Sequence, residues 1–348
     1  MTINEISKLA GVSTATVSYV INNKSGCVSE EVRARVLKII EENGYVPNKI
    51  ARSLREKRSK TIGVLAEDIT HFQTPGIIAG INSYLEQIDI HMILNNLSLT
   101  QKAGEHTGNV LQHKKEINDA IDILMEARVD GIIYIGWQDR DVGNLVKPLN
   151  VPLVYAYCFS EVDGRSWISY DNESSMEEIL DKVFSLKHRK IAFVSGGDEL
   201  CRPAEMRFNI YQKKLAAEGI PLRREYIKHG DWSFNAGRQF YRELVALEDP
   251  PTVILSLNDH MAGGMIKESM DTDRRILNEI SVVGFNGFEF ASFLSPTLAT
   301  VSLPLEQIGY EAAKQLLTEI NNKNCEHKQE FLKCQFVNGS SLKINPFA

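Results

Sequence analysis

Short polar side chains are concentrated on one side of the stretch GVSTATVSYVINNK, residues 11–24. An ordinary exposed helix carries long Glu, Lys and Gln side chains, whereas this stretch presents hydroxyls, one methyl, one tyrosine and one asparagine. Small residues let a backbone approach another surface closely, and hydroxyls form hydrogen bonds with phosphates or with base edges. The residues with this chemistry are Ser13, Thr14, Ala15, Thr16, Ser18, Tyr19 and Asn22. They predict a helix face that fits a nucleic-acid groove.

A second set of candidate binding residues lies in the stretch PNKIARSLREKRSK, residues 47–60. Asn48 is expected to cap a helix of about two turns that carries Arg52, Leu54 and Arg55, and so short a helix is unstable by itself in water. The basic side chains give this segment a positive field. A leucine exposed among arginines suits a wedge between base steps in the minor groove, whereas the alternative is a solvated charged linker.

Two short helices are expected to position the first set. Thr2 and Glu5 form a capping box that predicts a helix over residues 3–10, and after a glycine turn Ser13 caps a second helix over residues 14–22. Their shared apolar positions, which we expect to pack on each other, are Ile6, Leu9, Val12, Val17, Val20 and Ile21.

A third helix is expected after Ser29, which caps it, and it ends at Gly44. Its apolar side carries Val32, Val36, Ile39 and Ile40. Two short helices joined by a glycine turn and clamped by a third form a helix-turn-helix. The pattern therefore predicts that the second helix is the one that contacts DNA.

The charge is distributed unevenly along the chain. Residues 1–60 contain 11 Lys and Arg and 6 Asp and Glu, a net charge of +5, whereas the remaining residues contain 28 and 39, a net charge of −11. A basic segment on an acidic body indicates a polyanion-binding module attached to a second functional unit.

Residues 1–60 resemble the DNA-binding headpiece of the lactose-repressor (LacI/GalR) family of bacterial transcription regulators. The resemblance is carried by TINEISKLAGVSTATVSYVIN, VSEEVRARVLKIIEENGYVPN and ARSLR, in that order. It implies that Thr14, Ala15, Tyr19 and Asn22 face bases or nearby phosphates, that Ser13, Thr16 and Ser18 hold the DNA backbone, and that Leu54 is the minor-groove wedge. Many members have arginine in place of Tyr19, so the base preference at that position is left open.

Residues 61–348 alternate apolar runs with amphipathic segments. The apolar runs are TIGVLAE, HMILNN, DGIIYIG, PLVYAY, KIAFVSG, YIKHG, TVILSL and SVVGF. Runs of this kind between helices predict buried parallel strands in a doubly wound α/β fold, with enough strands for two sheets. The resemblance implies the two-lobed type I architecture of periplasmic binding proteins, with a cleft between the lobes.

The expected domains follow from these assignments. They are a helix-turn-helix domain at 1–46, a hinge helix and linker at 47–60, and an effector-binding and dimerisation domain at 61–348. Lobe 1 is expected at 61–158 and 291–320 and lobe 2 at 160–289 and 322–348, with the chain crossing near Phe159, Phe290 and Asn321.

Ligand-binding residues are expected just beyond the carboxyl ends of the strands. Trp232 follows the strand YIKH, where its indole would cover the apolar face of a pyranose or, as the alternative, fill the core. The resemblance implies that Arg207 forks onto ligand oxygens, the alternative being an ion pair with Glu205. It also implies that Asp259 accepts from sugar hydroxyls, although this residue lies where a helix N-cap is expected. The further candidates are Phe72, Tyr157 and Asn286, the last in place of a common aspartate.

Several other classes of protein fit the sequence less well. A solute-binding protein of a transport system would share the body but would begin with a signal peptide and would not need residues 1–58. A nucleotide-dependent dehydrogenase would need a glycine-rich loop after its first strand, yet IGVLA continues into EDITHFQ. No G-x-S-x-G, P-loop or H-E-x-x-H motif is found, so neither enzymatic activity nor a cofactor is expected.

The remaining expectations concern metals, location and partners. Five scattered cysteines without a C-x-x-C pair predict no metal site, and no apolar run reaches the ~20 residues of a membrane span, so a cytoplasmic protein is expected.

The helix-turn-helix pattern and the family resemblance together predict a homodimeric repressor that binds a near-palindromic operator and is controlled by an effector in the cleft. A sugar or sugar derivative is the expected effector, and nucleobases and phosphorylated metabolites are alternatives.

Overall fold

A computed structural model of the chain describes residues 1–21, 23, 26–45, 58–99, 110–196, 202–322 and 324–348. The chain forms two compact units, Met1–Ser59 and Lys60–Ala348, each with its own core. The predicted DNA-contacting residues Asn22, Asn48, Arg52, Leu54 and Arg55 lie outside the described residues.

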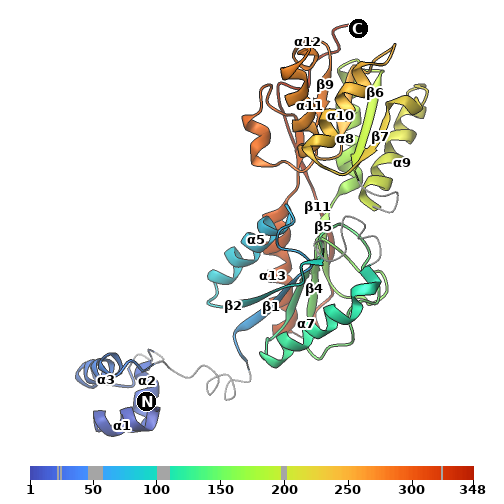
Figure 1. The fold of residues 1–348 in the computed structure, drawn as a ribbon. Coiled ribbons are helices and arrows are strands. Elements are labelled where there is room, and N and C mark those ends of the chain that lie inside the picture. The colour runs from blue at the N-terminus through green and yellow to red at the C-terminus, as the bar shows by residue number, and fades with distance from the viewer. Residues whose placement is uncertain (22, 24–25, 46–57, 100–109, 197–201, 323) are drawn as a thin grey trace. The chain divides into compact units, whose positions relative to one another are not determined.

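The described part of the first unit contains the three predicted helices, α1 (Ile3–Ala10), α2 (Thr14–Ile21) and α3 (Glu30–Glu42) (Figure 1). The capping box of α1 is present, because the Thr2 hydroxyl accepts the Glu5 amide at 3.3 Å and the Glu5 carboxylate accepts the Thr2 amide at 2.8 Å. Gly11 ends α1 with φ of 64°, a left-handed conformation that glycine adopts at little cost. The glycine turn is therefore confirmed.

The core of the first unit is made by all three helices. Its buried members are Ile6, Ala10, Val17, Val20 and Val36. Leu9 is 59% exposed, so its assignment to the core was wrong. The reason is helix geometry: α1 packs through Ile6 and Ala10, which are four residues apart and share a face, and Leu9 lies beside that face.

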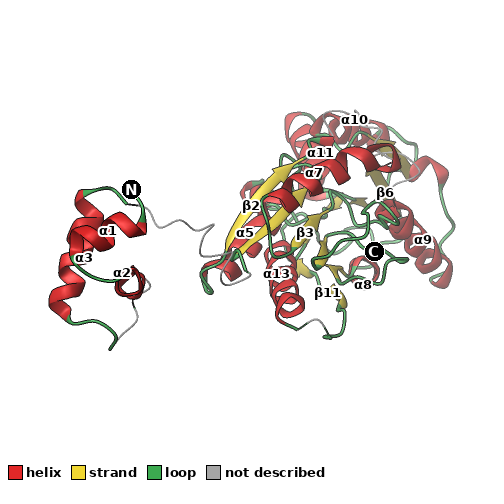
Figure 2. Cartoon of the chain, turned by 90° about the horizontal axis from the view of Figure 1, so that it is seen from below, coloured by secondary structure: helices red, strands yellow, loops and turns green. Residues whose placement is uncertain are grey.

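The second unit, residues 60–348, contains two parallel sheets, each covered by helices on both faces (Figure 2). The first sheet has the strand order β11-β5-β4-β3-β1-β2. Its strands are β1 (Thr61–Ala66), β2 (His91–Asn96), β3 (Ile132–Ile135), β4 (Leu153–Ala156), β5 (Trp167–Tyr170) and β11 (Gln329–Leu332), and its helices are α5 (Thr74–Glu86), η1 (Val110–His113), α7 (Lys114–Glu126) and α13 (Leu305–Asn321).

Alternate residues of the first sheet enter different cores. Val64 and Ile133 pack with the residues of α5 and α13, whereas Leu65 and Tyr134 pack with those of α7 on the other face. Because successive side chains of a strand point to opposite faces, a strand covered on both faces must be apolar throughout. This explains the continuous apolar runs in the sequence.

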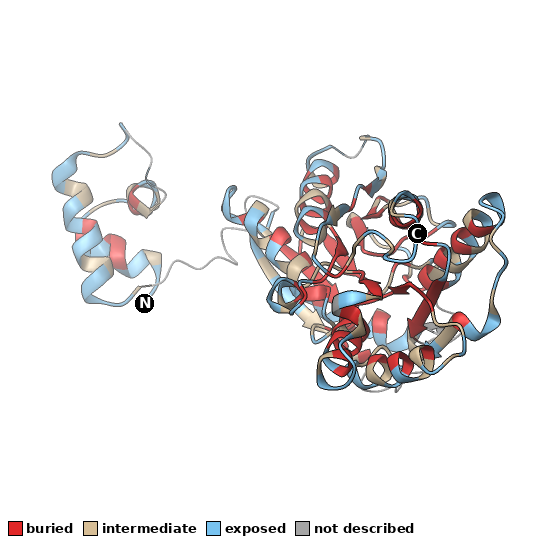
Figure 3. Cartoon of the chain, turned by 90° about the horizontal axis from the view of Figure 1, so that it is seen from above, coloured by how far each residue is buried: buried red, intermediate tan, exposed pale blue. Residues whose placement is uncertain are grey.

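The second sheet has the order β7-β6-β8-β9 and is also parallel. Its strands are β6 (Ile191–Gly196), β7 (Ile227–Gly230), β8 (Val253–Ser256) and β9 (Ser281–Val283), and its helices are α8 (Asn172–Ser185), α9 (Arg202–Ala217), η2 (Arg224–Tyr226), α10 (Phe234–Val245), α11 (Asp259–Asp271) and α12 (Arg275–Asn278). Figure 3 shows buried residues in the interior of the sheets and exposed residues on the outward faces of the helices, and the inner strands β1, β3, β4, β6 and β8 are buried almost throughout. Every quoted apolar run is a strand, and the predicted fold class is confirmed.

The lobe boundaries differ from those expected. β5 and β11, which we had assigned to lobe 2, pair with each other and belong to the first sheet. After leaving the second sheet, the chain forms η3 (Glu289–Phe293) and β10 (Thr300–Ser302), which pairs with β12 (Gln335–Val337). The crossings therefore lie after Tyr170, β10 and β11 rather than near Phe159, Phe290 and Asn321. The predicted boundaries failed because WISY and QEFL are short and pair only through contacts distant in sequence.

Candidate functional site

The first unit presents the predicted polar face of α2. Val17 and Val20 are buried against α1 and α3, whereas Ser13, Thr14, Ala15 and Tyr19 are exposed. Thr16 and Ser18 are half-buried. The face is therefore flat and polar, with Tyr19, which is 37% exposed, as its large side chain.

The start of α2 is fixed by Ser13. Its hydroxyl accepts the Thr16 amide at 3.1 Å and lies 2.9 Å from the Thr16 hydroxyl. This satisfies one of the amides that a helix N-terminus leaves without an intrahelical partner. The predicted cap is present, and the remaining first-turn amides and hydroxyls lie at the positive end of the helix, where a phosphate is favoured.

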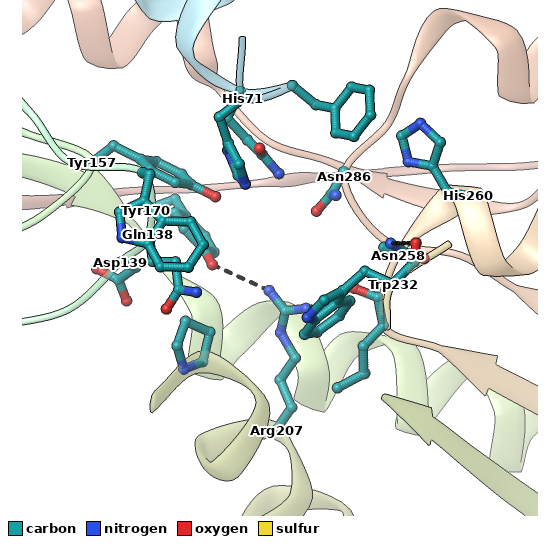
Figure 4. Close-up of a pocket in the computed structure, with 15 residues that line it drawn as sticks. His71, Gln138, Asp139, Tyr157, Tyr170, Arg207, Trp232, Asn258, His260 and Asn286 are labelled. Carbon is teal, nitrogen blue, oxygen red and sulfur yellow. Dashed lines mark hydrogen bonds between the residues drawn. The ribbon is translucent and has the colours of Figure 1, made fainter. Parts of the chain in front are cut away.

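A cavity of about 160 Å³ lies within the second unit and is lined by residues from both lobes (Figure 4). Its lining residues are His71, Phe72, Gln73, Trp137, Gln138, Asp139, Tyr157, Tyr170, Pro203, Arg207, Trp232, Leu257, Asn258, His260 and Asn286. Five of the six predicted effector-binding residues, Phe72, Tyr157, Arg207, Trp232 and Asn286, are among them.

The cavity lies where the strand order of the sheets reverses. His71 and Phe72 follow β1 and Trp137 follows β3, and these two strands are neighbours from which the chain proceeds in opposite directions. Asn258 follows β8, which neighbours β6 at the corresponding point of the second sheet. A crevice forms at such a point because the loops diverge to opposite faces of the sheet.

Trp232 reaches the cavity from the end of β7. Its backbone has φ of 64°, and its backbone carbonyl accepts a hydrogen bond from the side-chain amide of Asn258 at 2.8 Å. A Cβ on Gly196, at the end of β6, would lie 2.3 Å from the indole, so only glycine lets the ring lie this close to the strand. The indole is partly exposed and also packs against the cores of lobe 2. The two roles considered for Trp232, core packing and ligand stacking, are thus compatible.

Arg207 is buried, with 4% of its surface exposed, and its guanidinium is fixed by hydrogen bonds. It donates to the Asn172 side chain at 2.6 Å, to the Leu257 carbonyl at 3.2 Å and to the Tyr170 hydroxyl at 3.1 Å, and it lies 3.4 Å from the centre of the Phe285 ring. Among the described residues no ion pair joins Arg207 to Glu205. The cation is therefore held in place with no carboxylate of the described residues at salt-bridge distance.

Asp139 and Tyr157 complete the lobe 1 side of the cavity. Tyr157 stacks on Tyr170 with ring centres 5.4 Å apart. Asp139 accepts the Ser169 hydroxyl at 2.8 Å and forms an ion pair with Arg202 of lobe 2 at 3.4 Å. Burial raises the pKa of the Asp139 carboxyl, although the hydrogen bond and the nearby arginines oppose the shift. Asp139 thus links the two lobes beside the cavity.

The lobe 1 wall also contains a buried ion pair behind Trp137. Glu67 has no exposed surface, and its oxygens accept Arg140 Nη2 at 2.7 and 2.8 Å, the Trp137 amide at 3.0 Å and the Tyr134 hydroxyl. The Arg140 guanidinium also lies 5.6 Å from the centre of the indole of Trp137.

His71 meets Trp137 edge-on, with ring centres 5.5 Å apart and an angle of 88° between the rings. Burial lowers the pKa of His71 to about 4, so the ring is neutral near pH 7. Its buried Nδ1 and the buried Oε1 of Gln73 have no hydrogen-bond partner among the described residues. A neutral ring and an amide oxygen that both line the cavity are suited to a ligand with hydroxyl or amide donors.

Aromatic side chains connect the lobes on the other side of the cavity. Phe72 of lobe 1 is 61% exposed and lies 4.1 Å from His260 and 5.7 Å from Phe288 of lobe 2, measured between ring centres. His260 is itself surrounded by aromatic rings, and burial lowers its pKa. Phe72 therefore contacts both the cavity and the opposite lobe.

Asp259 does not line the cavity. It has no exposed surface, and its oxygens accept the Thr300 hydroxyl at 2.6 Å and the Phe288 amide at 2.8 Å. The N-cap of α11 is Asn258, whose side chain accepts the Met261 amide at 2.8 Å. The expectation that Asp259 caps the helix was wrong, because the helix begins one residue earlier and the carboxylate is turned inward. The contact with a ligand hydroxyl stays a prediction, for a residue that is not part of the cavity lining. Burial raises the pKa of Asp259 to about 7.

Sequence reasoning missed most of the lobe 1 wall. The missed lining residues are His71, Gln73, Trp137, Gln138, Asp139, Tyr170, Pro203, Leu257, Asn258 and His260. The signal that found Trp232 would also have found Trp137, Gln138 and Asp139, because they directly follow the apolar strand IIYI. The described residues contain no group of three or more His, Cys, Asp or Glu that could hold a metal. Nor does any helix in the described ranges have the length and apolarity to span a membrane.

A DNA-facing helical unit joined to a two-lobed ligand-binding unit defines the class of effector-controlled DNA-binding regulators. Comparison with known proteins agrees with this class. Residues 2–48 match bacterial regulatory proteins of the lacI family, and residues 180–342 match the periplasmic binding protein-like domain. The chain is 30% identical over 347 residues to the HTH-type transcriptional repressor PurR of Photobacterium profundum, covering 98% of each chain. It therefore belongs to the lacI family of bacterial regulatory proteins and is a DNA-binding transcription regulator.

Two further comparisons cover nearly the whole chain. Catabolite control protein A of Priestia megaterium is 29% identical over 324 residues, or 93% of each chain. A crystal structure of the lac repressor dimer bound to operator and the anti-inducer ONPF superimposes with a TM-score of 0.80, at 24% identity and with 98% of each chain covered. The second of these similarities shows that the two chains share their fold.

Proposed function

We propose that the protein is a repressor that binds a near-palindromic operator as a homodimer, and that a small molecule in the cavity of the second unit controls this binding. The observation that carries the proposal is the presence, in one chain, of an exposed α2 face of small polar side chains and of a cavity built between two lobes. Relatives named as repressors support repression as the outcome. Such a protein would act in the cytoplasm, where the chromosome is.

The α2 face would enter the major groove. Thr14, Ala15 and Tyr19 would contact base edges or nearby phosphates, and Ser13, Thr16 and Ser18 would hold the DNA backbone. Beyond the described residues, Asn22 would extend this face, and Asn48, Arg52, Leu54 and Arg55 would form the hinge helix with Leu54 as its minor-groove wedge.

A homodimer would place two α2 helices about 34–36 Å apart, one turn of DNA, on the two half-sites of the operator. The first sheet offers a surface for a second copy, because β2 lies at its edge with Ile93 and Leu94 39% and 40% exposed. An edge strand with exposed apolar side chains is normally covered by another chain or element.

The effector would be a sugar or sugar derivative. Trp232 would cover the apolar face of a pyranose, Arg207 would donate to ring or hydroxyl oxygens, and Asn286 would donate to or accept from hydroxyls. Nucleobases and phosphorylated metabolites are the alternative classes, and Asp259 would support the wall from behind. The effector would act by preferring one arrangement of the lobes, which in turn sets the geometry of the two DNA-binding units.

The DNA-binding part can be tested by selecting binding sites from random duplexes with the full-length protein. We expect the selection to yield a two-fold symmetric sequence. The affinity of the protein for it should fall steeply as salt rises, with a slope of log binding constant against log salt concentration of roughly −0.9 for each phosphate neutralised. Tyr19→Ala should weaken binding to the selected site by about 1–3 kcal/mol and relax the base preference at one position of each half-site. Glu41→Gln, an exposed change on α3, is the matched control.

Two results would contradict this part of the proposal. The first is a selected sequence without two-fold symmetry. The second is full operator affinity in two variants, Tyr19→Ala and the Thr14→Glu, Ala15→Glu double variant. Changes at three positions of the α2 face cannot leave a groove contact intact.

A further inference from the structure

The cavity contains two tryptophans, one from each lobe. Trp232 follows β7 of lobe 2, and Trp137 follows β3 of lobe 1. In Figure 4 the labelled side chains Tyr157 and Tyr170 approach the cavity opposite Trp232 and His260, so aromatic groups face the cavity from both lobes. Trp137 adds an indole to the lobe 1 side.

Trp137 differs from the other tryptophans in what it packs against. Trp167 packs against the α7-side core of lobe 1 and lies 4.7 Å from Phe331, and Trp232 packs against two of the cores. Within the described residues, Trp137 belongs to none of the hydrophobic cores and packs against none of them. A partly exposed indole that serves no core and lines a cavity needs another explanation.

Trp137 is held in place through its backbone and its ring. Its backbone amide donates to Glu67 at 3.0 Å, the guanidinium of Arg140 lies 5.6 Å from the centre of the indole, and His71 meets the indole edge-on at 5.5 Å. Glu67 has no exposed surface and bonds both Arg140 and the Trp137 backbone amide, so the ion pair fixes the backbone at Trp137. A side chain held in this way loses little conformational entropy when a ligand packs on it.

The space that remains is small. The cavity encloses about 160 Å³, close to the ~150 Å³ of an engineered protein cavity that binds benzene. Gln138, Asn258, Asn286 and Arg207 supply hydrogen-bonding groups around it. Aromatic walls with a polar rim suit one flat-faced ring that carries hydroxyls.

We infer that Trp137 contacts the effector as the lobe 1 counterpart of Trp232, and that the effector is a single hydroxylated ring of monosaccharide size. This inference rests on the proposed function of the cavity. A ring can contact both indoles in only one arrangement of the lobes, so its affinity is higher in that arrangement. Trp137 therefore also determines how strongly the ligand favours that arrangement over the others. Arg140 is a positioning residue that acts through Trp137.

The test is a calorimetric titration of the full-length protein with defined probes. The single-ring probes are D-glucose, D-galactose, D-glucuronate, D-glucose 6-phosphate and adenine, and the two-ring probes are maltose and cellobiose. We expect a single-ring sugar to bind most tightly. For that probe Trp137→Ala should weaken binding at least about tenfold, whereas Trp137→Phe, which keeps an aromatic face, should stay closer to wild type. Trp167→Phe, outside the cavity, is the control.

A spectroscopic measurement covers the case in which Trp137→Ala folds poorly. The Trp167→Phe protein should change its fluorescence when the sugar binds, and part of that change should disappear in the Trp137→Phe, Trp167→Phe double variant. An indole with a merely structural role would contribute no such part.

The outcomes separate this inference from the proposed function. Full affinity of Trp137→Ala with weakened binding by Trp232→Ala would reject Trp137 as a contact and leave the effector site standing. Tighter binding of maltose or cellobiose than of every single-ring probe would reject the size of the effector. Binding of no probe at all would reject the single-ring assignment, while operator selection would still decide the DNA-binding function independently.

Discussion

The two lobes each bury a carboxylate behind the cavity wall, and they satisfy it in different ways. In lobe 1, Glu67 is paired with Arg140 and also accepts hydrogen bonds from Tyr134 and Trp137. In lobe 2, Asp259 accepts from neutral donors, among them the Thr300 hydroxyl and the Phe288 backbone amide, and no described cation lies at salt-bridge distance. The first arrangement fixes a charge pair and the loop that carries Trp137. The second leaves a carboxyl whose pKa burial raises to about 7.

The lobes are alike in how their helices pack. In lobe 1 a Cβ on Gly80 would lie 1.9 Å from the Glu306 carbonyl, and in lobe 2 a Cβ on Gly237 would lie 2.0 Å from the Met261 carbonyl. Each lobe thus has a pair of helices, α5 with α13 or α10 with α11, whose backbones touch at glycine. The shared packing indicates a common scaffold, and the different carboxylates show where each lobe has its own electrostatics.

The largest expected effect comes from breaking the charge pair of lobe 1. Arg140→Met should lower the free energy of unfolding of the second unit by about 3–5 kcal/mol, because Glu67 is left buried without its counterion. The measurement is urea unfolding followed by circular dichroism. In the Glu67→Gln, Arg140→Met double variant much of the loss should be recovered. If the single and double variants were equally destabilised, the pair would not be the cause.

The second effect is proton-linked stability in lobe 2. Because the pKa of Asp259 is raised to about 7 in the folded protein, the folded state binds a proton that the unfolded state has released between about pH 4 and pH 7. The stability that this proton supplies is full below about pH 4 and is lost as the pH rises to about 7. It should amount to a few kcal/mol, at about 1.4 kcal/mol for each unit of pKa shift.

The comparison of wild type with Asp259→Asn isolates this contribution. His71 of lobe 1 acts in the opposite sense, since its pKa of about 4 makes the folded protein lose stability as the pH falls from about 6.5 to 4. The difference between the two proteins cancels the His71 contribution. A difference that stayed constant from pH 4 to pH 7 would show that Asp259 is ionised throughout.

The smallest effect concerns the feature that the lobes share. Gly80→Ala should cost about 1–3 kcal/mol, because the new methyl group meets the backbone carbonyl of Glu306, which cannot move aside. Gly76→Ala, one turn earlier in α5, meets only side-chain atoms of Leu305 at 3.0 Å and is the matched control. Gly237→Ala should resemble Gly80→Ala in its effect on thermal unfolding. Equal stability of the Gly76 and Gly80 variants would mean that the helices can separate at no cost.

Much of the fold could be predicted because its signals are local. The caps at Thr2, Ser13 and Ser29, the glycine turn and each quoted apolar run are present as expected. Capping depends on residues three apart, and a strand covered on both faces must be apolar, so a short window of sequence contains the information. The one misassigned core residue of the headpiece, Leu9, lies beside the buried face of its helix.

The candidate site was predicted only in part. Phe72, Tyr157, Arg207, Trp232 and Asn286 line one cavity although they lie more than 200 residues apart at the extremes. Trp137 could have been predicted from its place after the strand IIYI, but only the structure shows that it packs against none of the hydrophobic cores of the described residues. Asp259 was placed in the site on the family resemblance alone. Its expected N-cap role was wrong because the sequence does not distinguish the N-cap from the first helical residue in LNDH, and one residue of shift rotates a side chain by about 100°.

By itself the sequence determined the three helices of the headpiece and eight of the strands, that a basic helix-turn-helix precedes an acidic α/β body, and that the chain resembles DNA-binding regulators. Only the tertiary structure decided that β5 and β11 complete the first sheet and which residues share the cavity. It also decided that Glu67 has a counterion whereas Asp259 has none among the described residues. The physical reason is the distance along the sequence over which each interaction acts. Capping and periodicity act between neighbours, whereas strand pairing, burial and the pKa of a buried acid depend on groups that only folding brings together.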